Sequence, residues 1–247
     1  MISRKEQHGD CTFVTVSETG LSHRIQKISN QDAASFIVSE NDFALAVSDG
    51  VGSCAKAEIG SQAAVLSVET VFSSIKKEGV QPDSAGIAKL IIDEWIRHLE
   101  GENPNDCCAT LKAVMKYGNQ LFLFSIGDGM LAVSSRGMWC CAPMDNGLFV
   151  NQTMRLNMNV KSADFWTSEF LLDTYVPYAV FACSDGVMNG IQEGRERELV
   201  TEIETRTPVE DLQSELEELI VDLAEFSSDD RTVGVVKYER KNEKSDR

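Results

Sequence analysis

The chain has 247 residues, of which 43% are hydrophobic and 25% are charged, a composition that excludes disordered and collagen-like proteins. Because no Gly-, Ser- or Pro-rich linker interrupts it, we predict one domain over residues 1–247, with a core at about 10–238 and a charged tail at 239–247. The 23 Lys and Arg against 39 Asp and Glu give a net charge of −16, which excludes general binding to nucleic acid or to anionic membranes, since both need basic patches.

The first half of the chain predicts three strands followed by two helices. Short runs of apolar and β-branched residues indicate strands at 13–16, 33–39 and 43–48. A proline-free stretch with helical spacing of apolar residues then predicts a helix at 56–77. A second helix opens at Pro82 and runs to about Leu99, with its apolar residues on one face.

The second half predicts mainly strands. The strand-like runs lie at 110–115, 121–126, 131–134, 178–183 and 232–238, and the first three form an antiparallel meander. Thr207 and Pro208 begin a helix whose apolar face extends to Leu223. Since strands come in runs and helices in separate blocks, the chain is expected to be α+β, with helices outside antiparallel sheets.

Residues 143–177 are irregular and predict a long loop or flap, a kind of segment that is often functional. Its polar stretch 151–153 and the aromatic residues Phe149, Phe165 and Trp166 have two open interpretations. They contact substrate, or the aromatic side chains anchor the loop on the core.

Cysteine usage predicts a reducing compartment. The seven Cys cannot all pair in disulfides, and Cys107–Cys108 and Cys140–Cys141 are adjacent pairs, unlike the separated pairs of a zinc ribbon. No segment resembles a signal peptide or reaches the roughly 18 apolar residues of a membrane span. We therefore expect reduced, mostly buried thiols in a cytoplasmic protein, and disfavour a zinc or redox role.

Carboxylates gather where predicted strands end. Asp49, Asp128 and Asp185 each follow an apolar strand and continue into Gly, while Asp32 and Asp229 stand just before strands. One Asp-Gly pair would indicate only a turn. The repeated pattern favours a site for Mg²⁺ or Mn²⁺, because these ions prefer carboxylate and carbonyl oxygens. Two such ions can activate a water and hold a phosphoryl oxygen.

Six short motifs occur in order along the chain, between residues 30 and 232. They are NQDA (30–33), SDGVG (48–52), ATL (109–111), GDG (127–129), SDGV (184–187) and DDRT (229–232). Each is weak alone, but the ordered set resembles the metal-dependent serine/threonine protein phosphatases of type 2C, especially their bacterial branch, and the resemblance extends over about residues 20–237. The resemblance implies an antiparallel β-sandwich flanked by pairs of helices, in four layers of the order α-β-β-α.

The resemblance also implies a binuclear Mg²⁺ or Mn²⁺ site with a place for a third ion. The ligands that it implies are Asp32, Asp49, Gly50, Asp128, Asp185 and Asp229. In this pattern Asp49 bridges two ions, with the carbonyl of Gly50 on one of them, and Asp32 acts mostly through metal-bound waters. Asp128, together with Asp185, corresponds to the place of the third ion.

The implied reaction is direct attack of a metal-activated water on phosphoserine or phosphothreonine, without a phosphoenzyme. The implied partner is a phosphorylated protein, the target of a cognate Ser/Thr kinase, and we expect a monomer. Two alternatives remain open. One is a regulatory module that keeps the fold without turnover, since fold does not imply function. The other is a metal-dependent phosphoesterase acting on small molecules.

Phosphate binding departs from the family pattern. Many members carry an Arg five residues before the Asp of the NQDA-type motif, and that position here is Lys27, which lacks the bidentate fork of Arg. Arg24 is a nearby substitute. The segment from Gly20 to His23 resembles a Gly-x-Ser-His segment of one bacterial subgroup, so His23 is a candidate for phosphate binding and for protonating the leaving group. The predicted catalytic residues are thus Asp32, Asp49 and His23.

Overall fold

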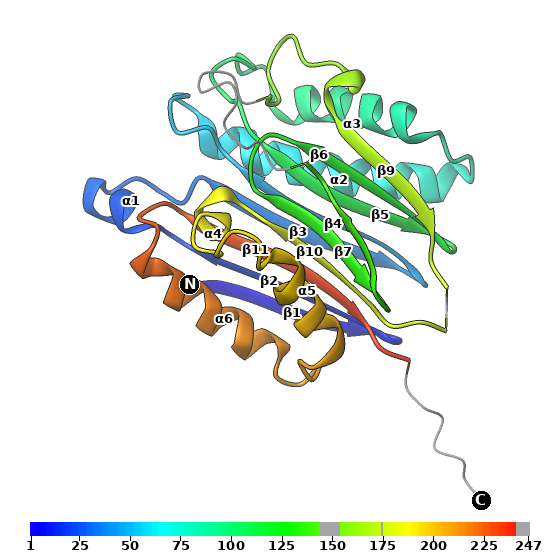
Figure 1. The fold of residues 1–247 in the computed structure, drawn as a ribbon. Helices are drawn as coiled ribbons and strands as arrows, with labels where there is room; N and C mark the ends of the chain where they lie inside the picture. Colours follow the sequence, from blue (N-terminus) through cyan, green and yellow to red (C-terminus); the bar gives the residue numbers. More distant parts are fainter. Residues whose placement is uncertain (144–153, 174, 241–247) are drawn as a thin grey trace, which may run out of the picture.

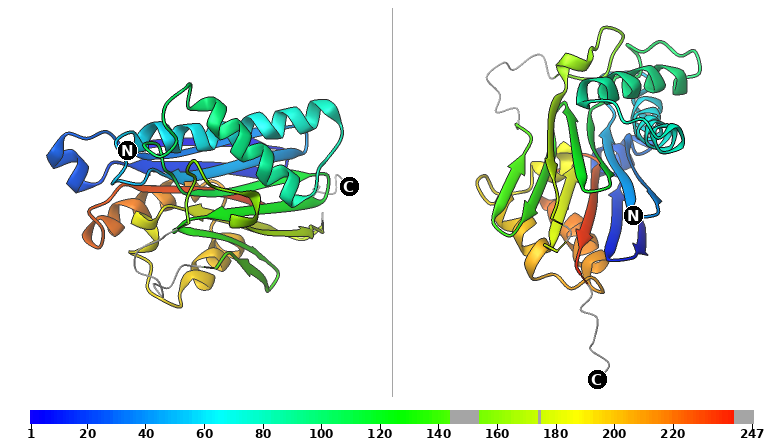
Figure 2. Two further views of the ribbon diagram at one scale, coloured as in Figure 1. Left: turned by 90° about the horizontal axis from the view of Figure 1, so that it is seen from above. Right: turned by 90° about the vertical axis from the view of Figure 1, so that its right-hand side faces the viewer.

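The structure, a computed structural model, describes residues 1–143, 154–173 and 175–240. Two antiparallel sheets pack face to face, and helices cover both outer faces (Figure 1). The predicted α+β class and its four-layer α-β-β-α sandwich are confirmed. Figure 2 shows the same layers from two further directions.

Each sheet is built from antiparallel neighbours. The six-stranded sheet has the order β1-β2-β11-β10-β7-β8, with β1 (Ile2–His8), β2 (Cys11–Glu18), β7 (Met130–Ser135), β8 (Met138–Cys141), β10 (Tyr178–Cys183) and β11 (Arg231–Tyr238). The five-stranded sheet has the order β3-β4-β5-β6-β9, with β3 (Asp32–Ser39), β4 (Asp42–Asp49), β5 (Leu111–Tyr117), β6 (Gln120–Ile126) and β9 (Trp166–Leu171).

The helices divide between the two outer faces. The five-stranded sheet is covered by α2 (Ala57–Glu78) and α3 (Ser84–His98), and the six-stranded sheet by α5 (Glu196–Thr205) and α6 (Leu212–Asp222). The short helical elements are α1 (Leu21–Gln26), α4 (Asp185–Met188), η1 (Ser162–Asp164) and η2 (Leu223–Glu225). None of the helices in the described part of the chain combines the length and apolar character needed to cross a bilayer.

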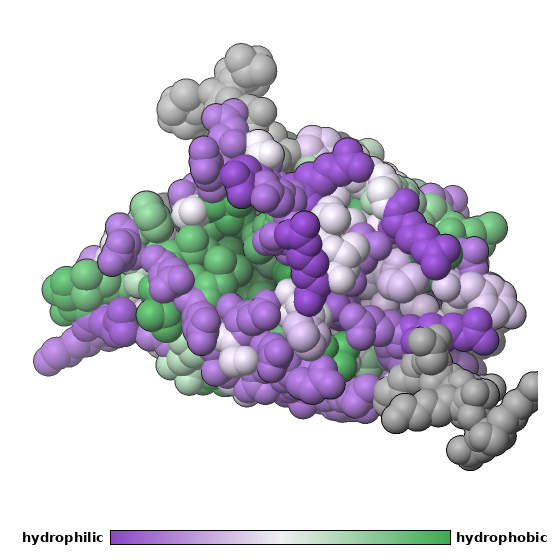
Figure 3. Space-filling model, turned by 60° about the horizontal axis from the view of Figure 1, so that its bottom comes forward, coloured by the Kyte–Doolittle hydropathy of each residue, from purple (hydrophilic) through white to green (hydrophobic). Residues whose placement is uncertain are grey.

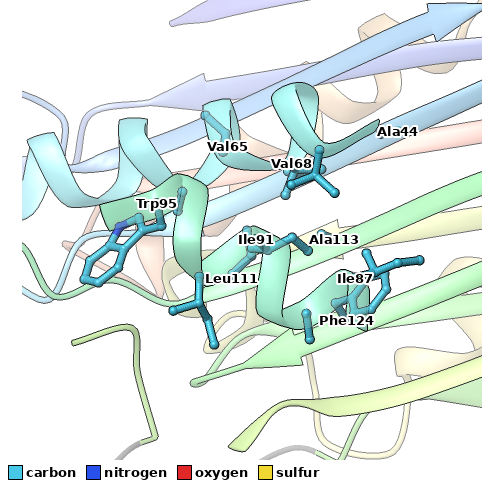
Figure 4. Close-up of a cluster of buried hydrophobic side chains, with 14 of the residues drawn as sticks. Ala44, Val65, Val68, Ile87, Ile91, Trp95, Leu111, Ala113 and Phe124 are labelled. Carbon is cyan, nitrogen blue, oxygen red and sulfur yellow. The ribbon is translucent and has the colours of Figure 1, made fainter. Parts of the chain in front are cut away.

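Apolar side chains fill the spaces between the layers. Between the sheets, the ring of Phe13 stacks on Phe36 and meets the edge of Phe43, with centroids 5.4 and 5.3 Å away. Under α2 and α3, Trp95 is fully buried and its indole N–H donates to the carbonyl of Gly60 at 3.1 Å (Figure 4). Polar side chains cover most of the face seen in Figure 3, around one hydrophobic hollow. The core is thus formed by the apolar faces of helices and strands, which the spacing of apolar residues in the sequence indicated.

Several elements differ from the sequence predictions. The strands β1, β8 and β9 and the helices α1, α4 and α5 were not predicted. The strands are short or polar on both faces, and the longest of these helices, α5, has only ten residues, few of them apolar. The last helix begins at Leu212 rather than Thr207, since the chain first makes turns at residues 208–211 and the Thr207 hydroxyl bonds Glu215 instead of capping.

The predicted irregular segment 143–177 contains regular structure. Phe165 is buried against the helix layer, and Trp166 begins β9 and packs against the core between the sheets. These two aromatic side chains therefore anchor the segment. Phe149 and residues 151–153, also candidates for substrate contact, lie outside the described residues, as do residues 241–247 of the predicted tail.

Candidate active site

A cavity of about 530 Å³ opens at one end of the sandwich. Chain segments that are far apart in sequence meet there: the connections after β4, β6 and β10, the residues before β11, and α1. The ionisable side chains that line the cavity are His23, Asp49, Asp128, Arg155, Asp185 and Asp229. The structure therefore brings together four of the five aspartates predicted at strand ends, and Asp32 lies directly behind them.

The position of Asp32 follows from strand register. Asp32 and Asp49 are opposite each other in the antiparallel pair β3–β4, and Asp32 is buried. The Asp49 backbone is fixed from the other side, because its N–H donates to the Thr110 hydroxyl at 3.0 Å and its carbonyl accepts the Thr110 N–H at 2.8 Å. The NQDA, SDGVG and ATL motifs thus form one hydrogen-bonded unit.

Glycine after the aspartates permits close backbone approach. A Cβ on Gly50 would lie 2.4 Å from the carbonyl oxygen of Ala57, and one on Gly186 would lie 1.9 Å from that of Asp230. Neither position has room for a side chain. Glycine is therefore required at both positions for steric reasons. At Gly186 it lets the Asp185 turn pack against the segment that carries Asp229 and Asp230.

Crowding of carboxylates changes their acidity. Burial raises the pKa of Asp32 to about 7. Burial and the charges of Asp128 and Asp229 raise the pKa of Asp185 to about 6. Burial and the charges of Asp32 and Asp185 raise the pKa of Asp49 well above its usual range. Each of these shifts reflects negative charge that the surrounding protein does not compensate.

Asp230 organises the edge of the cavity, a role that the sequence analysis missed. Its buried carboxylate accepts the backbone N–H groups of Gly20 at 2.7 Å and Gln31 at 2.6 Å. It also contacts Nδ1 of His23 at 2.8 Å. His23, Asp229 and Asp230 each place a ligand atom within 4.8 Å of the others. The second Asp of the DDRT motif was the available signal.

Of the three predicted phosphate-binding residues, one lines the cavity and two do not. His23 lines the cavity, but Arg24 and Lys27 are exposed and are not part of the lining. Arg24 pairs with Glu18 at 3.0 Å, and Lys27 ends α1 in the left-handed conformation, with φ of 59°. Their predicted role stays a prediction that this geometry does not support.

Arg155 lines the cavity instead, and the sequence analysis did not identify it. The N–H of Leu156 donates to the carbonyl of Ala109 at 2.8 Å, which holds Arg155 beside the ATL motif. Among the described residues, its half-buried guanidinium has no hydrogen-bond or ion-pair partner. A free arginine in an acidic cavity has five N–H donors available for an anion.

The side chains fit divalent cations. Oδ2 of Asp32 and Oδ1 of Asp185 are buried and have no hydrogen-bond partner within the described ranges. Carboxylate oxygens are the donors that Mg²⁺ and Mn²⁺ prefer, and cations would remove the repulsion that raises the pKa values. The cavity thus offers the carboxylate oxygens that a site for divalent cations requires.

Comparison with known proteins identifies the family. Residues 19–221 match the family model described as Protein phosphatase 2C. The chain therefore belongs to the protein phosphatase 2C family and is a serine/threonine phosphatase by class, as the motifs predicted. No curated protein sequence matches it significantly.

Solved structures share the fold at low sequence identity. RsbX in complex with magnesium is 14% identical, with a TM-score of 0.65 over 96% of this chain and 100% of that one. The serine/threonine phosphatase Stp1 from Staphylococcus aureus is 16% identical, with a TM-score of 0.68 over 95% and 96%. PppA, a regulatory component of T6SS in Pseudomonas aeruginosa, is 16% identical, with a TM-score of 0.61 over 93% and 98%. At such identities the likeness concerns the fold alone.

Proposed function

We propose that this protein hydrolyses phosphoserine and phosphothreonine in proteins, with Mg²⁺ or Mn²⁺ bound at the aspartate cluster. The observation that carries the proposal is that Asp49 and Asp185, with raised pKa values, line a cavity with Asp32 behind them. The same cavity contains Arg155, which has no hydrogen-bond or ion-pair partner among the described residues. We further propose that it acts as a cytoplasmic monomer on targets of a cognate Ser/Thr kinase.

The proposed metal ligands are the aspartates on the cavity wall. Asp49, Gly50, Asp128, Asp185 and Asp229 all line the cavity. Asp49, the Gly50 carbonyl, Asp185 and Asp229 would hold two ions, and Asp128 would help to hold a third. When bound, the ions supply an activated water and neutralise the phosphoryl oxygens. Asp32, behind Asp49, keeps one buried oxygen available to accept a hydrogen bond from water.

The proposed substrate-binding residues are Arg155 and His23. Arg155 is suited to bidentate binding of phosphoryl oxygens, because its planar fork matches their geometry. His23 is held by Asp230 through Nδ1, so its Nε2 is available to donate a proton to the serine or threonine oxygen that leaves. The proton then stays on the released alcohol, and solvent returns one to His23.

Hydrolysis of p-nitrophenyl phosphate and of a phosphothreonine peptide, with and without Mn²⁺, tests this function. Asp49→Asn and Asp185→Asn should lose metal-dependent turnover by a factor of about 10² or more, since each removes a carboxylate of the cluster. Asp83→Asn is the matched control, because Asp83 caps α3 and Asn caps a helix as well.

Turnover that is independent of added metal, or unchanged in both cluster variants, would contradict the proposal. A folded parent protein that binds Mn²⁺ but hydrolyses neither substrate would favour the regulatory module. Turnover of small phosphate esters without turnover of phosphopeptides or phosphoproteins would favour the small-molecule phosphoesterase.

A further inference from the structure

Two cysteine thiols meet behind the loop that follows Asp49. Sγ of Cys54 and Sγ of Cys108 both contact the carbonyl oxygen of Asn105, at 3.5 and 3.3 Å. The Cys54 thiol is also near enough to Cys108 to contribute to the raised pKa of that thiol. Residues that are far apart in the sequence thus place their sulfur atoms side by side, although neither is needed for phosphoester hydrolysis.

The ligand set is too small for a thiolate metal site. Structural zinc requires four ligands, usually Cys and His. Within the described ranges, no group of three His, Cys, Asp or Glu ligand atoms that lie within 4.8 Å of one another includes Cys54 or Cys108. The Cys54–Cys108 pair therefore has the composition of a dithiol.

The two sulfurs differ in access. Cys54 is half-exposed in the loop, whereas Cys108 is buried. Burial, together with the neighbouring Cys54 thiol, raises the pKa of Cys108 to about 11, so Cys108 is the weaker first nucleophile. An accessible thiol beside a second, resolving thiol is the arrangement of cysteines that undergo reversible oxidation.

The dithiol adjoins the cavity through the backbone. The N–H of Val51 donates to the carbonyl of Cys108 at 2.9 Å, and the N–H of Cys54 donates to the carbonyl of Val51 at 2.8 Å. Gly50 and Val51 line the cavity. In a disulfide the two sulfurs lie about 2.05 Å apart, which is closer than two thiols approach without a bond. Formation of this bond therefore displaces the loop that carries Val51 and Cys54.

We propose that Cys54 and Cys108 form an oxidisable dithiol, a covalent modification site whose disulfide distorts the loop 50–54 and lowers phosphatase turnover. The oxidant is a peroxide or a low-molecular-weight disulfide. The bond itself is independent of the proposed function, whereas its effect on turnover rests on it.

With hydrogen peroxide, the Cys54 thiolate attacks one peroxide oxygen, and the O–O bond breaks to give a sulfenic acid and water. The Cys108 thiolate then attacks the Cys54 sulfur, the S–O bond breaks, and the oxygen leaves as water. Two thiols and one peroxide become one disulfide and two waters. With a disulfide oxidant, two exchange steps give the same bond and release two thiols.

The test treats the full chain with a small excess of hydrogen peroxide and maps peptides by mass spectrometry without reductant. We expect a Cys54–Cys108 cross-link and a fall in Mn²⁺-dependent kcat/KM of about tenfold or more, because small displacements of catalytic groups have large effects. Dithiothreitol should restore both. Binding of Mn²⁺ to oxidised and reduced protein, measured calorimetrically, gives a second readout that requires no turnover.

Cys54→Ser should keep the parent's activity and resist inactivation, since a serine hydroxyl can also donate to Asn105 but cannot form a disulfide. Cys140→Ser, in β8 on the other sheet, is the matched control and should be inactivated like the parent. A cross-link to Cys107, over-oxidation of Cys54 without a cross-link, or a cross-linked enzyme with full activity would overturn the proposal. A cross-link in a protein that has no activity even when reduced would instead count against the proposed function alone.

Discussion

Nδ1 of His23 lies 2.8 Å from Oδ2 of Asp230, and that carboxylate also accepts two backbone N–H groups. We assign Nδ1 of the imidazole as the donor in this contact, because the carboxylate acts as the acceptor in its two backbone hydrogen bonds as well. The second ring nitrogen, Nε2, is thereby left for chemistry in the cavity that His23 lines. We therefore propose that Asp230 is a positioning residue, which acts through His23.

If His23 protonates the leaving group, its removal should affect substrates unequally. For His23→Ala we expect kcat on a phosphothreonine peptide to fall about 10²-fold, because an alkoxide needs a proton to leave. p-Nitrophenolate leaves without one, so hydrolysis of p-nitrophenyl phosphate should change much less. His98→Ala is the control, since His98 bonds Thr70 between α2 and α3. Equal losses on both substrates would indicate that His23 only supports the site.

Arg155 should act mainly on substrate binding. A hydrogen bond to a charged group contributes about 1.5–3 kcal/mol, so Arg155→Ala should raise KM for a phosphopeptide by about 10- to 100-fold. Arg155→Lys should recover part of this, because a point charge replaces a fork. Arg24→Ala and Lys27→Ala, which remove exposed cations outside the cavity, should change KM little. Steady-state kinetics of the four variants decides which cation binds phosphate.

The aspartate cluster was predictable because its signal is local. Asp49, Asp128 and Asp185 stand at the ends of apolar runs that buried strands require, so a reader of the sequence can place them at one edge. Arg155 could not be predicted, because the bridge between its neighbour Leu156 and Ala109 brings it to the cavity and the chain near it shows no periodicity. The Cys54–Cys108 contact likewise depends on how two loops meet.

The same reasoning explains the missed elements. Every residue of β1 is exposed, so the strand has no apolar alternation and is specified by its pairing with β2. The six residues of α1 include none that is buried, and its position follows from bonds between Ser22 and Ser228. Tertiary context, rather than local preference, determines such elements.

Removing metal should make stability depend on pH in a defined direction. The pKa values of Asp32, about 7, and Asp185, about 6, lie above the unfolded value of 3.8, so the folded metal-free protein binds protons more tightly than the unfolded chain. This contribution is complete below about pH 4 and is lost as pH rises through 6 and 7. Urea midpoints in EDTA should therefore fall between pH 5.5 and pH 8.

Two comparisons separate this effect from general charge repulsion at a net charge of −16. Mn²⁺ should raise the midpoint most at pH 8, where the carboxylates are ionised, because ligands that bind the folded state stabilise it. Asp32→Asn should flatten the pH dependence in EDTA, since the amide does not titrate. An unchanged slope in this variant would assign the pH effect to other groups.

The Gly60→Ala variant should show that packing between α2 and the segment at Cys107 affects the loop that follows Asp49. Alanine normally favours a helix interior over glycine by about 1 kcal/mol. In α2, however, a Cβ on Gly60 would lie 1.9 Å from the carbonyl oxygen of Cys107, so the helix or that segment must move. We expect Gly60→Ala to lose about 1–3 kcal/mol of unfolding free energy, the usual cost of overpacking.

Turnover of Gly60→Ala should fall as well, because the next carbonyl, that of Cys108, holds the N–H of Val51 on the cavity wall. Ser73→Ala, on the exposed side of the same helix, should leave stability within about 0.5 kcal/mol of the parent's. Urea unfolding and phosphopeptide kinetics measure the two effects on the same samples. A more stable Gly60→Ala protein would mean that helix propensity outweighs the contact with Cys107. It would also mean that α2 and the segment at Cys107 can move apart without a loss of unfolding free energy.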